Sequence, residues 1–267
     1  MKKINFQVIT LFPELVQSYL KDALLSKALN SGIVNIQVVD LRQYSDNKYK
    51  SVDDTVFGGG DGMLFKHAPL AQALKNLNVE KKLTPQKKIV YLSPQGNPWS
   101  SSKAKTWADS GDEIILVCGR YAGVDQRFIH RYVDEEISIG DYVLSGGELA
   151  ALVVIESVSR FIPGVLGDQN SSFVDSFEEG LLESPQFTKP QEIEGLKVPA
   201  VLTSGNHQRI AEWQKYCAIL VTLKKRPDLL KERTDISWND VKSFYRSLSH
   251  DEKIILDLDH LLELENK

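Results

Sequence analysis

The sequence predicts an α/β domain with a mostly parallel sheet over residues 1–165, followed by a small all-α domain. Three observations lead to this prediction. Short apolar runs alternate with helical segments through the first 165 or so residues. These runs are mostly apolar, as expected for strands buried on both faces of a parallel sheet. Beyond residue 176 the apolar residues recur at helical spacing instead.

Each element of the first domain follows from its residues in chain order. Strands are expected where β-rich apolar runs occur, at residues 3–9, 33–39, 88–92 and 113–118. Helices are expected between and after them, at residues 14–30, 69–77, 101–110 and 124–132. Gly32 is a plausible stop for the first helix. Residues 150–161 are apolar on nearly all faces and predict a buried helix.

A polar stretch rich in Gly, Asn and Ser, residues 166–176, has the composition of a linker. After it, one helix face carries Ile210, Trp213, Cys217, Leu220 and Val221. Pro227 ends this helix or starts the next one. Further helices are expected at residues 238–248 and 254–264. The division is therefore a first domain at 1–165, a linker at 166–176 and a helical domain at 177–267.

Composition excludes several classes of protein. The chain has 267 residues and a formal net charge of −4, which argues against a non-specific nucleic-acid coat. The two cysteines, Cys118 and Cys217, form neither a disulfide framework nor a CxxC pair, and the five histidines form no zinc motif. The N-terminus lacks an apolar signal core, and no apolar run reaches spanning length. These features predict a cytoplasmic protein without a membrane or DNA partner.

Three glycine-containing turns suggest a ligand pocket. They follow apolar runs at residues 91–96, 118–123 and 137–149. In open α/β sheets the ligand crevice lies at the carboxyl ends of the strands. Glycine lets the backbone bend sharply and approach a ligand closely. Three such loops would line a pocket with backbone N–H and C=O groups, which suits an adenosine-like ligand better than a triphosphate.

Other polar features leave alternatives open. The glycine-rich segment 53–63 lacks the Gly-Lys-Ser/Thr ending of a phosphate loop, so it is either a mobile surface loop or a lid that contacts RNA. Arg160 lies at the C-terminal end of the apolar helix, where an arginine commonly interacts favourably with the helix dipole. Asp175 has the sequence setting of a helix N-cap. Both residues are also candidates for catalysis.

Taken together, these motifs resemble the bacterial tRNA (guanine-37-N1)-methyltransferases, members of the knotted SPOUT superfamily. The resemblance runs from the first domain into the helical one, and only the last fifty or so residues and short loops lack a clear motif. The matching runs occur in the family's order, at residues 52–54, 57–60, 62–64, 91–96, 116–121, 134–149, 159–167, 175–177, 180–182 and 198–207.

The resemblance implies a deep trefoil knot in the first domain and a homodimer with each active site shared between subunits. It implies binding of S-adenosyl-L-methionine in a bent form, and methylation of N1 of guanosine 37 in a tRNA anticodon stem-loop, next to the anticodon, which protects the reading frame. That guanosine is expected to follow another guanosine. The implied cofactor-binding residues are Tyr91, Leu92, Ser93, Pro94, Gly119, Gly123, Ser138, Ile139, Gly140, Asp141, Tyr142, Val143, Leu144, Gly146 and Gly147.

The resemblance also assigns roles to the polar candidates. Asp175 aligns with the proposed general base, and Arg160 with the residue that stabilises negative charge on guanine O6. We expect substrate contacts from Asp54, Gly59, Ser176, Lys224 and Arg226, although the basic run 224–226 equally suits a solvated helix face. Magnesium dependence is implied without any ligands that the sequence can assign.

The sequence departs from the family pattern at three positions. Ala122 stands where Glu is usual, Thr55 where Arg is usual and Phe57 where Tyr is usual. The usual Glu is thought to position the guanine, so Ala122 puts the orientation of the base in doubt. It motivates the alternative of a SPOUT protein that binds RNA without catalysis. A third alternative is methylation of a different RNA.

Overall fold

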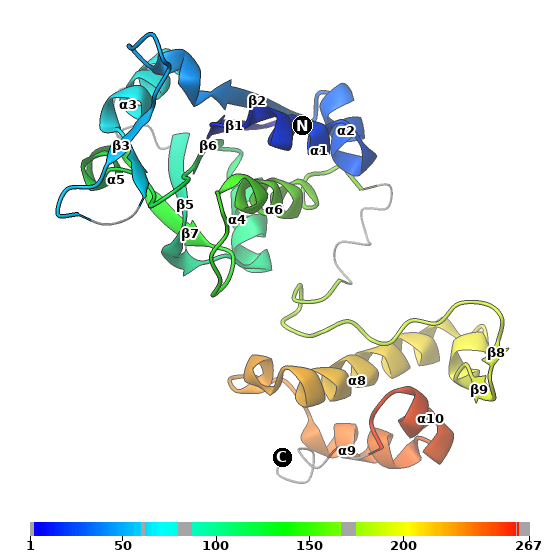
Figure 1. Cartoon of the computed structure of the whole chain (residues 1–267). Helices are drawn as coiled ribbons and strands as arrows, with labels where there is room; N and C mark the ends of the chain where they lie inside the picture. Colours follow the sequence, from blue (N-terminus) through cyan, green and yellow to red (C-terminus); the bar gives the residue numbers. More distant parts are fainter. Residues whose placement is uncertain (1–2, 60–61, 80–86, 167–174, 260, 262–267) are drawn as a thin grey trace. The chain divides into compact units, whose positions relative to one another are not determined.

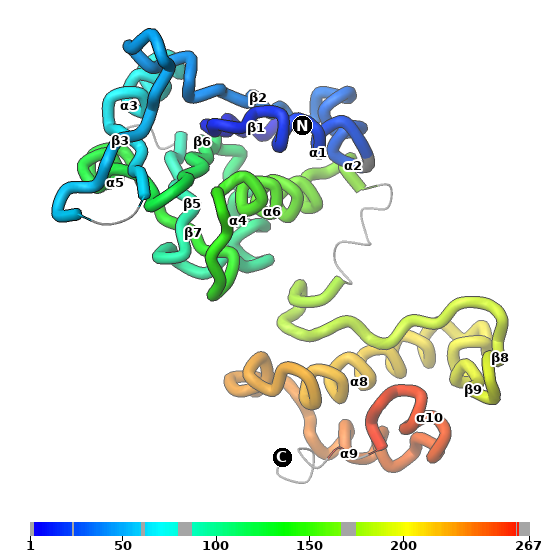
Figure 2. Tube along the Cα trace, in the orientation of Figure 1, coloured from blue at the N-terminus to red at the C-terminus, as the bar shows by residue number. Residues whose placement is uncertain are grey.

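The computed structural model describes residues 3–59, 62–79, 87–166, 175–259 and 261. The chain divides into two compact units, Met1–Gln169 and Asn170–Lys267. Figure 1 labels the elements of each unit, and Figure 2 traces the path of the chain through them.

The first unit contains a five-stranded sheet in the order β2-β1-β6-β5-β7. Every pairing in it is parallel, which confirms the predicted sheet type. The four predicted strands are present, and a fifth, β7, was not predicted because it is short and begins with two glutamates. The strands are β1 (Ile4–Thr10), β2 (Val34–Asp40), β5 (Lys87–Pro98), β6 (Glu113–Cys118) and β7 (Glu135–Ser138).

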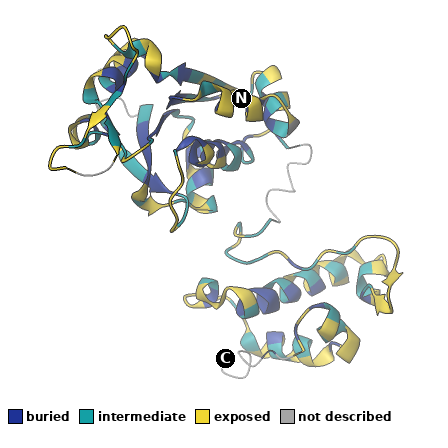
Figure 3. Cartoon of the chain, viewed as in Figure 1, coloured by how far each residue is buried: buried dark blue, intermediate teal, exposed yellow. Residues whose placement is uncertain are grey.

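Helices cover both faces of this sheet. Along β6, Ile114 and Leu116 pack into one hydrophobic cluster, whereas Ile115 and Val117 pack into the other. Alternate side chains of a strand point to opposite faces, so both layers draw on the same buried strands, which are dark blue in Figure 3. One cluster takes in α1 (Pro13–Leu20), α2 (Ala23–Asn30), α4 (Ser101–Ser110) and α6 (Glu148–Ser159); the other takes in η1 (Leu41–Tyr44), α3 (His67–Asn76) and α5 (Gln126–Tyr132).

The prediction of one helix over residues 14–30 is wrong, because the helix is interrupted at Lys21–Asp22, between α1 and α2. Both residues are exposed, and the Lys21 N–H bonds back only to the Ser18 carbonyl, 3.4 Å away. The break lets Val16 and Leu20 of α1 and Leu25 and Ala28 of α2 enter the same core cluster.

The last part of β5 pairs with the end of β7 at two separate places along β5. Leu92 and Asn97 both pair with Ile137, and the Trp99 N–H donates to the Ser138 carbonyl at 2.8 Å. A Cβ at Gly96 would lie 2.3 Å from the Ile137 nitrogen, so only glycine permits this approach of two backbones. Residues 92–99 therefore form a loop around β7, which is the local arrangement that a threaded chain requires. The deep knot itself remains a prediction.

The second unit is mainly helical. Its core packs Trp213, Cys217, Leu220 and Leu223 of the longest helix against residues of the shorter ones. The expectation of an all-α domain is wrong in one respect, because residues 192–197 form an antiparallel hairpin with left-handed Glu194 and Gly195 at its turn. The elements are β8 (Glu192–Ile193), β9 (Leu196–Lys197), η2 (Ala200–Thr203), α8 (His207–Lys225), η3 (Pro227–Leu230), α9 (Trp238–Ser247) and α10 (His250–Ile255).

The last predicted helix differs from the observed one. It was expected over residues 254–264, but α10 begins at His250, where Ser249 and Glu252 form a capping box, and ends at Ile255. Residues 260 and 262–264 of the predicted range lie outside the described part. Over the described chain, no helix is both long and apolar enough to cross a membrane.

Candidate active site

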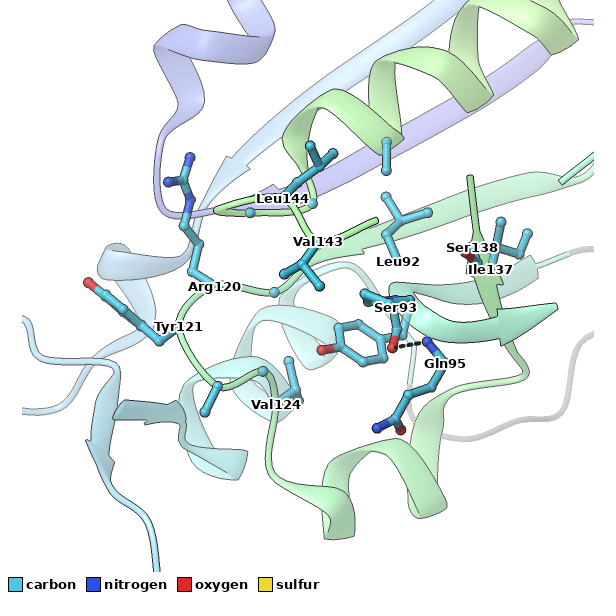
Figure 4. A pocket seen from close by; sticks show the side chains of 18 of the residues that line it. Leu92, Ser93, Gln95, Arg120, Tyr121, Val124, Ile137, Ser138, Val143 and Leu144 are labelled. Carbon is cyan, nitrogen blue, oxygen red and sulfur yellow. Dashed lines mark hydrogen bonds between the residues drawn. The ribbon is translucent and has the colours of Figure 1, made fainter. Parts of the chain in front are cut away.

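A cavity of about 590 Å³ lies where β5, β6 and β7 end. Three segments line it: residues 93–95, in the interrupted part of β5 between Leu92 and Asn97, residues 119–124 after β6, and residues 139–147 after β7. Figure 4 shows these loops meeting around the cavity, with Val143 and Leu144 contributed by the third. The volume falls within the range of pockets that enclose small-molecule ligands.

The structure brings the predicted cofactor residues together at this cavity, with one exception. Asp141 is exposed and is absent from the lining. The predicted residues that do line it are Tyr91, Leu92, Ser93, Pro94, Gly119, Gly123, Ser138, Ile139, Gly140, Tyr142, Val143, Leu144, Gly146 and Gly147.

Glycine is required at two places in these loops by space and backbone conformation. A Cβ at Gly119 would lie 2.8 Å from the Tyr91 hydroxyl oxygen. Gly140 has φ +148° and would place a Cβ 2.5 Å from the Tyr142 ring. The Ser138 hydroxyl contacts both the amide and the carbonyl of Gly140, at 3.2 and 3.1 Å, and so stabilises this turn. The loops therefore reach their positions only with these residue types.

Tyr91 lies beneath two of the loops and is nearly buried. Burial and then the Glu136 carboxylate raise the pKa of Tyr91 to about 12, while the Val124 backbone amide acts in the opposite direction. The phenol is therefore neutral at physiological pH and can donate a hydrogen bond.

The lining carries little net charge. Of the described residues that line the cavity, only Arg120 has a charged side chain, and it forms an ion pair of 3.0 Å with Glu148. In Figure 4 the Arg120 guanidinium points away from the side of the cavity formed by Ser93 and Gln95. On that side, the Gln95 backbone N–H donates to the Ser93 hydroxyl at 3.2 Å. A ligand with several phosphates would need uncompensated cations, so the lining favours a nucleoside-like ligand.

A short hairpin forms part of the rim of the cavity, which its residue Leu64 lines. Its strands are β3 (Asp53–Thr55) and β4 (Met63–Phe65). The Ala122 N–H donates to the Met63 carbonyl at 2.9 Å, and the Phe65 N–H donates to the Gly123 carbonyl at 3.0 Å. Asp54 is exposed on β3, and Gly59 has φ +78° in the connecting loop. The glycine-rich segment thus ends beside the second cavity loop; its residues 60–61 lie outside the described part.

The two predicted catalytic residues belong to different units. Arg160 is the C-cap of α6, and its N–H donates to the Glu156 carbonyl at 3.2 Å. Asp175 lies in the second unit, where its carbonyl accepts from the Glu178 N–H at 3.3 Å. Residues 176–179 form a turn, not a helix, so the N-cap interpretation of Asp175 is wrong.

Within the second unit, the predicted substrate residues approach one another. The Arg226 guanidinium lies 5.9 Å from the centre of the Phe177 ring, which brings it close to the segment that carries Asp175 and Ser176. The Ser176 hydroxyl accepts from the Glu183 N–H at 3.0 Å. Arg226 also forms a two-pronged pair with Asp228, and Lys224 pairs with Asp257 at 2.8 Å.

Several residues around the cavity were not predicted. Gln95 and Tyr121 line it and lie in predicted loops without having been named individually, whereas Gln126 of α5 lies outside those loops. Arg120 connects the cavity to the buried residues Thr10 and Glu148. One sequence signal could have identified Glu148, because it is a carboxylate at the start of an otherwise apolar helix. In the part of the chain that the structure describes, no three His, Cys, Asp or Glu residues are placed to hold a metal ion.

The fold and the cavity define an α/β protein with a cavity at one edge of a parallel sheet, whose volume and nearly uncharged lining suit a nucleoside-like small molecule. Comparison with known proteins then gives the family. Residues 4–232 match the family model described as tRNA (Guanine-1)-methyltransferase TrmD. The chain belongs to this tRNA (guanine-1)-methyltransferase family.

Relatives from distant bacteria support the assignment, and each is named tRNA (guanine-N(1)-)-methyltransferase. The protein of Clostridioides difficile is 43% identical over 87% of this chain and 100% of its own length. That of Halalkalibacterium halodurans is 46% identical over 86% and 92%. That of Neisseria meningitidis is 44% identical over 85% and 90%.

Proposed function

We propose that this chain transfers a methyl group from S-adenosyl-L-methionine to N1 of guanosine 37 in tRNA. The observation that carries the proposal is the glycine-lined cavity at the ends of β5, β6 and β7, in a member of a tRNA (guanine-1)-methyltransferase family. Family membership implies a methyl donor and a tRNA substrate. The identity of the donor and the position of the guanosine are the finer parts of the proposal.

The volume of the cavity and its nearly uncharged lining support S-adenosyl-L-methionine as the donor. Backbone groups of the glycine loops can bind the adenine edge, and the apolar side chains of Leu92, Ile137 and Ala150 can contact its faces. The neutral Tyr91 and the ion-paired Arg120 leave no uncompensated charge in the lining. When bound, the sulfonium supplies an electrophilic methyl group.

The residues of this chain supply the remaining chemistry. Guanine N1 carries a proton that must leave before or during attack on the methyl group, and the Asp175 carboxylate accepts it. Negative charge then grows on guanine O6, where the Arg160 guanidinium stabilises it with its several N–H donors. The target base must leave its stack to reach the cavity, at a cost of a few kcal/mol. Contacts from the Asp54–Gly59 side of the hairpin and from Ser176 offset this cost.

Each part of the chain has a role in the proposal. Residues 1–165 form the knotted domain that binds the methyl donor, residues 166–176 are the linker, and residues 177–267 bind the anticodon stem-loop through Lys224 and Arg226. Two copies pair so that Arg160 of one subunit and Asp175 of the other complete each site. A magnesium requirement belongs to the same expectation, without assigned ligands.

A face suited to such pairing lies on α1 and α6, which pack against each other. Leu15 and Tyr19 of α1 are about half exposed, as are Leu149 and Val153 of α6. Several large apolar residues together on neighbouring helices commonly mark a protein interface. This face is the structural support for the homodimer.

Ala122 bears on the alternative of a non-catalytic RNA-binding protein. It lies exposed at the cavity rim, and only its backbone is engaged, by Met63. Its methyl group cannot make the polar contact with a base that the usual Glu is thought to make. The family match and the presence of both Arg160 and Asp175 favour the enzyme.

The deciding experiment measures transfer of labelled methyl from S-adenosyl-L-methionine to two tRNA transcripts. The first has guanosines at positions 36 and 37, and the second has adenosine at 37. We expect label on the first alone. No label on either, together with measurable binding of the donor, would favour the non-catalytic alternative or another RNA. The Ala122→Glu variant would then show whether this position is responsible.

A further inference from the structure

A buried carboxylate joins three distant segments of the first unit behind the cavity. Glu148, the first residue of α6, is 2% exposed. Its Oε1 accepts a hydrogen bond of 2.7 Å from the hydroxyl of Thr10, at the end of β1. The same hydroxyl accepts from the Phe12 N–H at 2.9 Å. Arg120 in the second cavity loop donates from Nε to Oε1 at 3.3 Å and pairs through Nη2 with Oε2 at 3.0 Å.

These contacts connect two of the cavity loops. Arg120 forms an isolated antiparallel bridge with Gly146, and the Gly147 N–H donates to the Gly119 carbonyl at 3.0 Å. A Cβ at Gly146 would lie 2.3 Å from Arg120 Nε and 2.4 Å from Glu148 Oε2. The third loop therefore passes directly over the ion pair. Arg120 and Glu148 therefore lie directly against the backbone that lines the cavity.

The Arg120 side chain is held on a second side by an aromatic ring. Its guanidinium carbon lies 4.3 Å from the centre of the Phe12 ring, whose own backbone is tied to Thr10. Stacking and ion pairing together leave the guanidinium little freedom. The backbone of residues 119–123 is thus oriented by side-chain contacts that point away from the ligand.

We propose that Glu148 is a positioning residue for the methyl donor and acts through Arg120. The inference rests on the proposed function and deepens it. Loops already held in their binding geometry avoid the entropy cost of ordering when the ligand binds. Removing the charge of Glu148 leaves the partly buried Arg120 guanidinium without a compensating charge, so the guanidinium turns toward water and the two loops separate.

The test measures the dissociation constant of S-adenosyl-L-methionine by calorimetry, without tRNA. We expect E148Q, which keeps the volume of the side chain, to raise this constant at least tenfold. The matched control is E113Q, which removes a partly exposed 3.2 Å ion pair with Lys87 at the opposite end of β6. E113Q should leave the constant within twofold of the wild type, although both variants lose one ion pair.

A double-mutant cycle separates positioning from general stabilisation. If Glu148 acts through Arg120, E148Q combined with R120Q should bind no more weakly than the weaker single variant. Effects that multiply would overturn the inference, as would wild-type affinity in E148Q.

If E148Q fails to fold, Thr10→Val and Thr10→Ser replace it. Only Thr10→Val removes the hydroxyl, so only Thr10→Val should weaken binding, and equal affinities would overturn the inference.

The same measurements distinguish failure of this inference from failure of the proposed function. A wild-type protein that does not bind the donor would overturn both. A wild-type protein that binds, with E148Q equally tight, would overturn only the role of Glu148. Hydrogen exchange gives a further readout, because E148Q should speed the exchange of amides 119–123 and 146–147, whereas E113Q should not.

Discussion

At the scale of single residues, the proposed chemistry assigns the central roles to Asp175 and Arg160. We expect Asp175→Asn to lower the turnover number for methyl transfer by a factor of about 10²–10⁴, because the amide cannot take the N1 proton. Binding of S-adenosyl-L-methionine should be unchanged, because Asp175 belongs to the second unit and the cavity lining lies in the first. Rapid-quench kinetics with saturating tRNA checks this.

Arg160→Lys provides the companion measurement. Lysine keeps the charge but loses the planar set of donors, so we expect an intermediate loss of turnover. Unaffected turnover in Asp175→Asn would remove the general-base assignment, whatever the result for Arg160.

Tyr91 gives a prediction about alkaline pH. Its pKa of about 12 in the folded protein exceeds the ordinary value of 10. The neutral phenol therefore contributes stability that is fully present below pH 10 and is lost as the pH rises toward 12. We expect the difference in unfolding free energy between wild type and Tyr91→Phe, measured by urea denaturation, to shrink or change sign as the pH rises from 10 to 12. A constant difference between them from pH 8 to 12 would contradict the shift.

At the scale of elements, α5 depends on its cap. The Asp125 carboxylate accepts from the Arg127 N–H at 2.9 Å and also pairs with the Arg127 guanidinium. These contacts lower the pKa of Asp125 to about 2. Asp125→Ala should cost about 1 kcal/mol of unfolding free energy above pH 4, and the cost should fade as the pH falls toward 2. Denaturant titration at pH 7 and pH 3 tests this, with Asp109→Ala on α4 as a comparison.

The end of α8 offers a second prediction at this scale. Lys224 and Arg226 have intramolecular carboxylate partners, whereas Lys225 is exposed between them. Charge reversal at Lys225 should therefore weaken tRNA binding more than reversal at Lys197, which pairs with Glu192 on the hairpin. The slope of log affinity against log salt should also become flatter by about one. An unchanged slope would exclude residues 224–226 from the tRNA interface.

At the scale of the whole molecule, the exposed face of α1 and α6 predicts self-association. Val153→Glu places a charge in the middle of this face, where burial in an interface would be costly. We expect it to shift the protein from dimer to monomer in sedimentation experiments and to abolish methyl transfer, because each site would lose its partner. Ile254→Glu, at a similarly exposed residue of α10, should leave the oligomeric state unchanged. A monomeric wild type with full activity would contradict the shared site.

Local patterns in the sequence were sufficient to predict the parallel sheet, its four longer strands and most helices. After its first residue, β6 is apolar at every position because both of its faces are buried, and this signal does not depend on distant residues. The glycine turns also marked where a ligand could approach, since glycine is required locally by backbone conformation. The break between α1 and α2 and the short strand β7 were missed because tertiary packing, not periodicity, determines them.

Only the tertiary structure shows the contacts that hold the cavity together. Thr10 and Glu148 are separated by 138 positions, and no spacing rule connects them. The loop of β5 around β7 and the placement of Arg120 against Phe12 likewise arise when distant segments meet. The sequence by itself determined which runs are apolar and where the backbone can turn, because those properties are local. The structure decided which buried charges pair and which loops they orient, because those interactions depend on distances that the chain acquires only on folding.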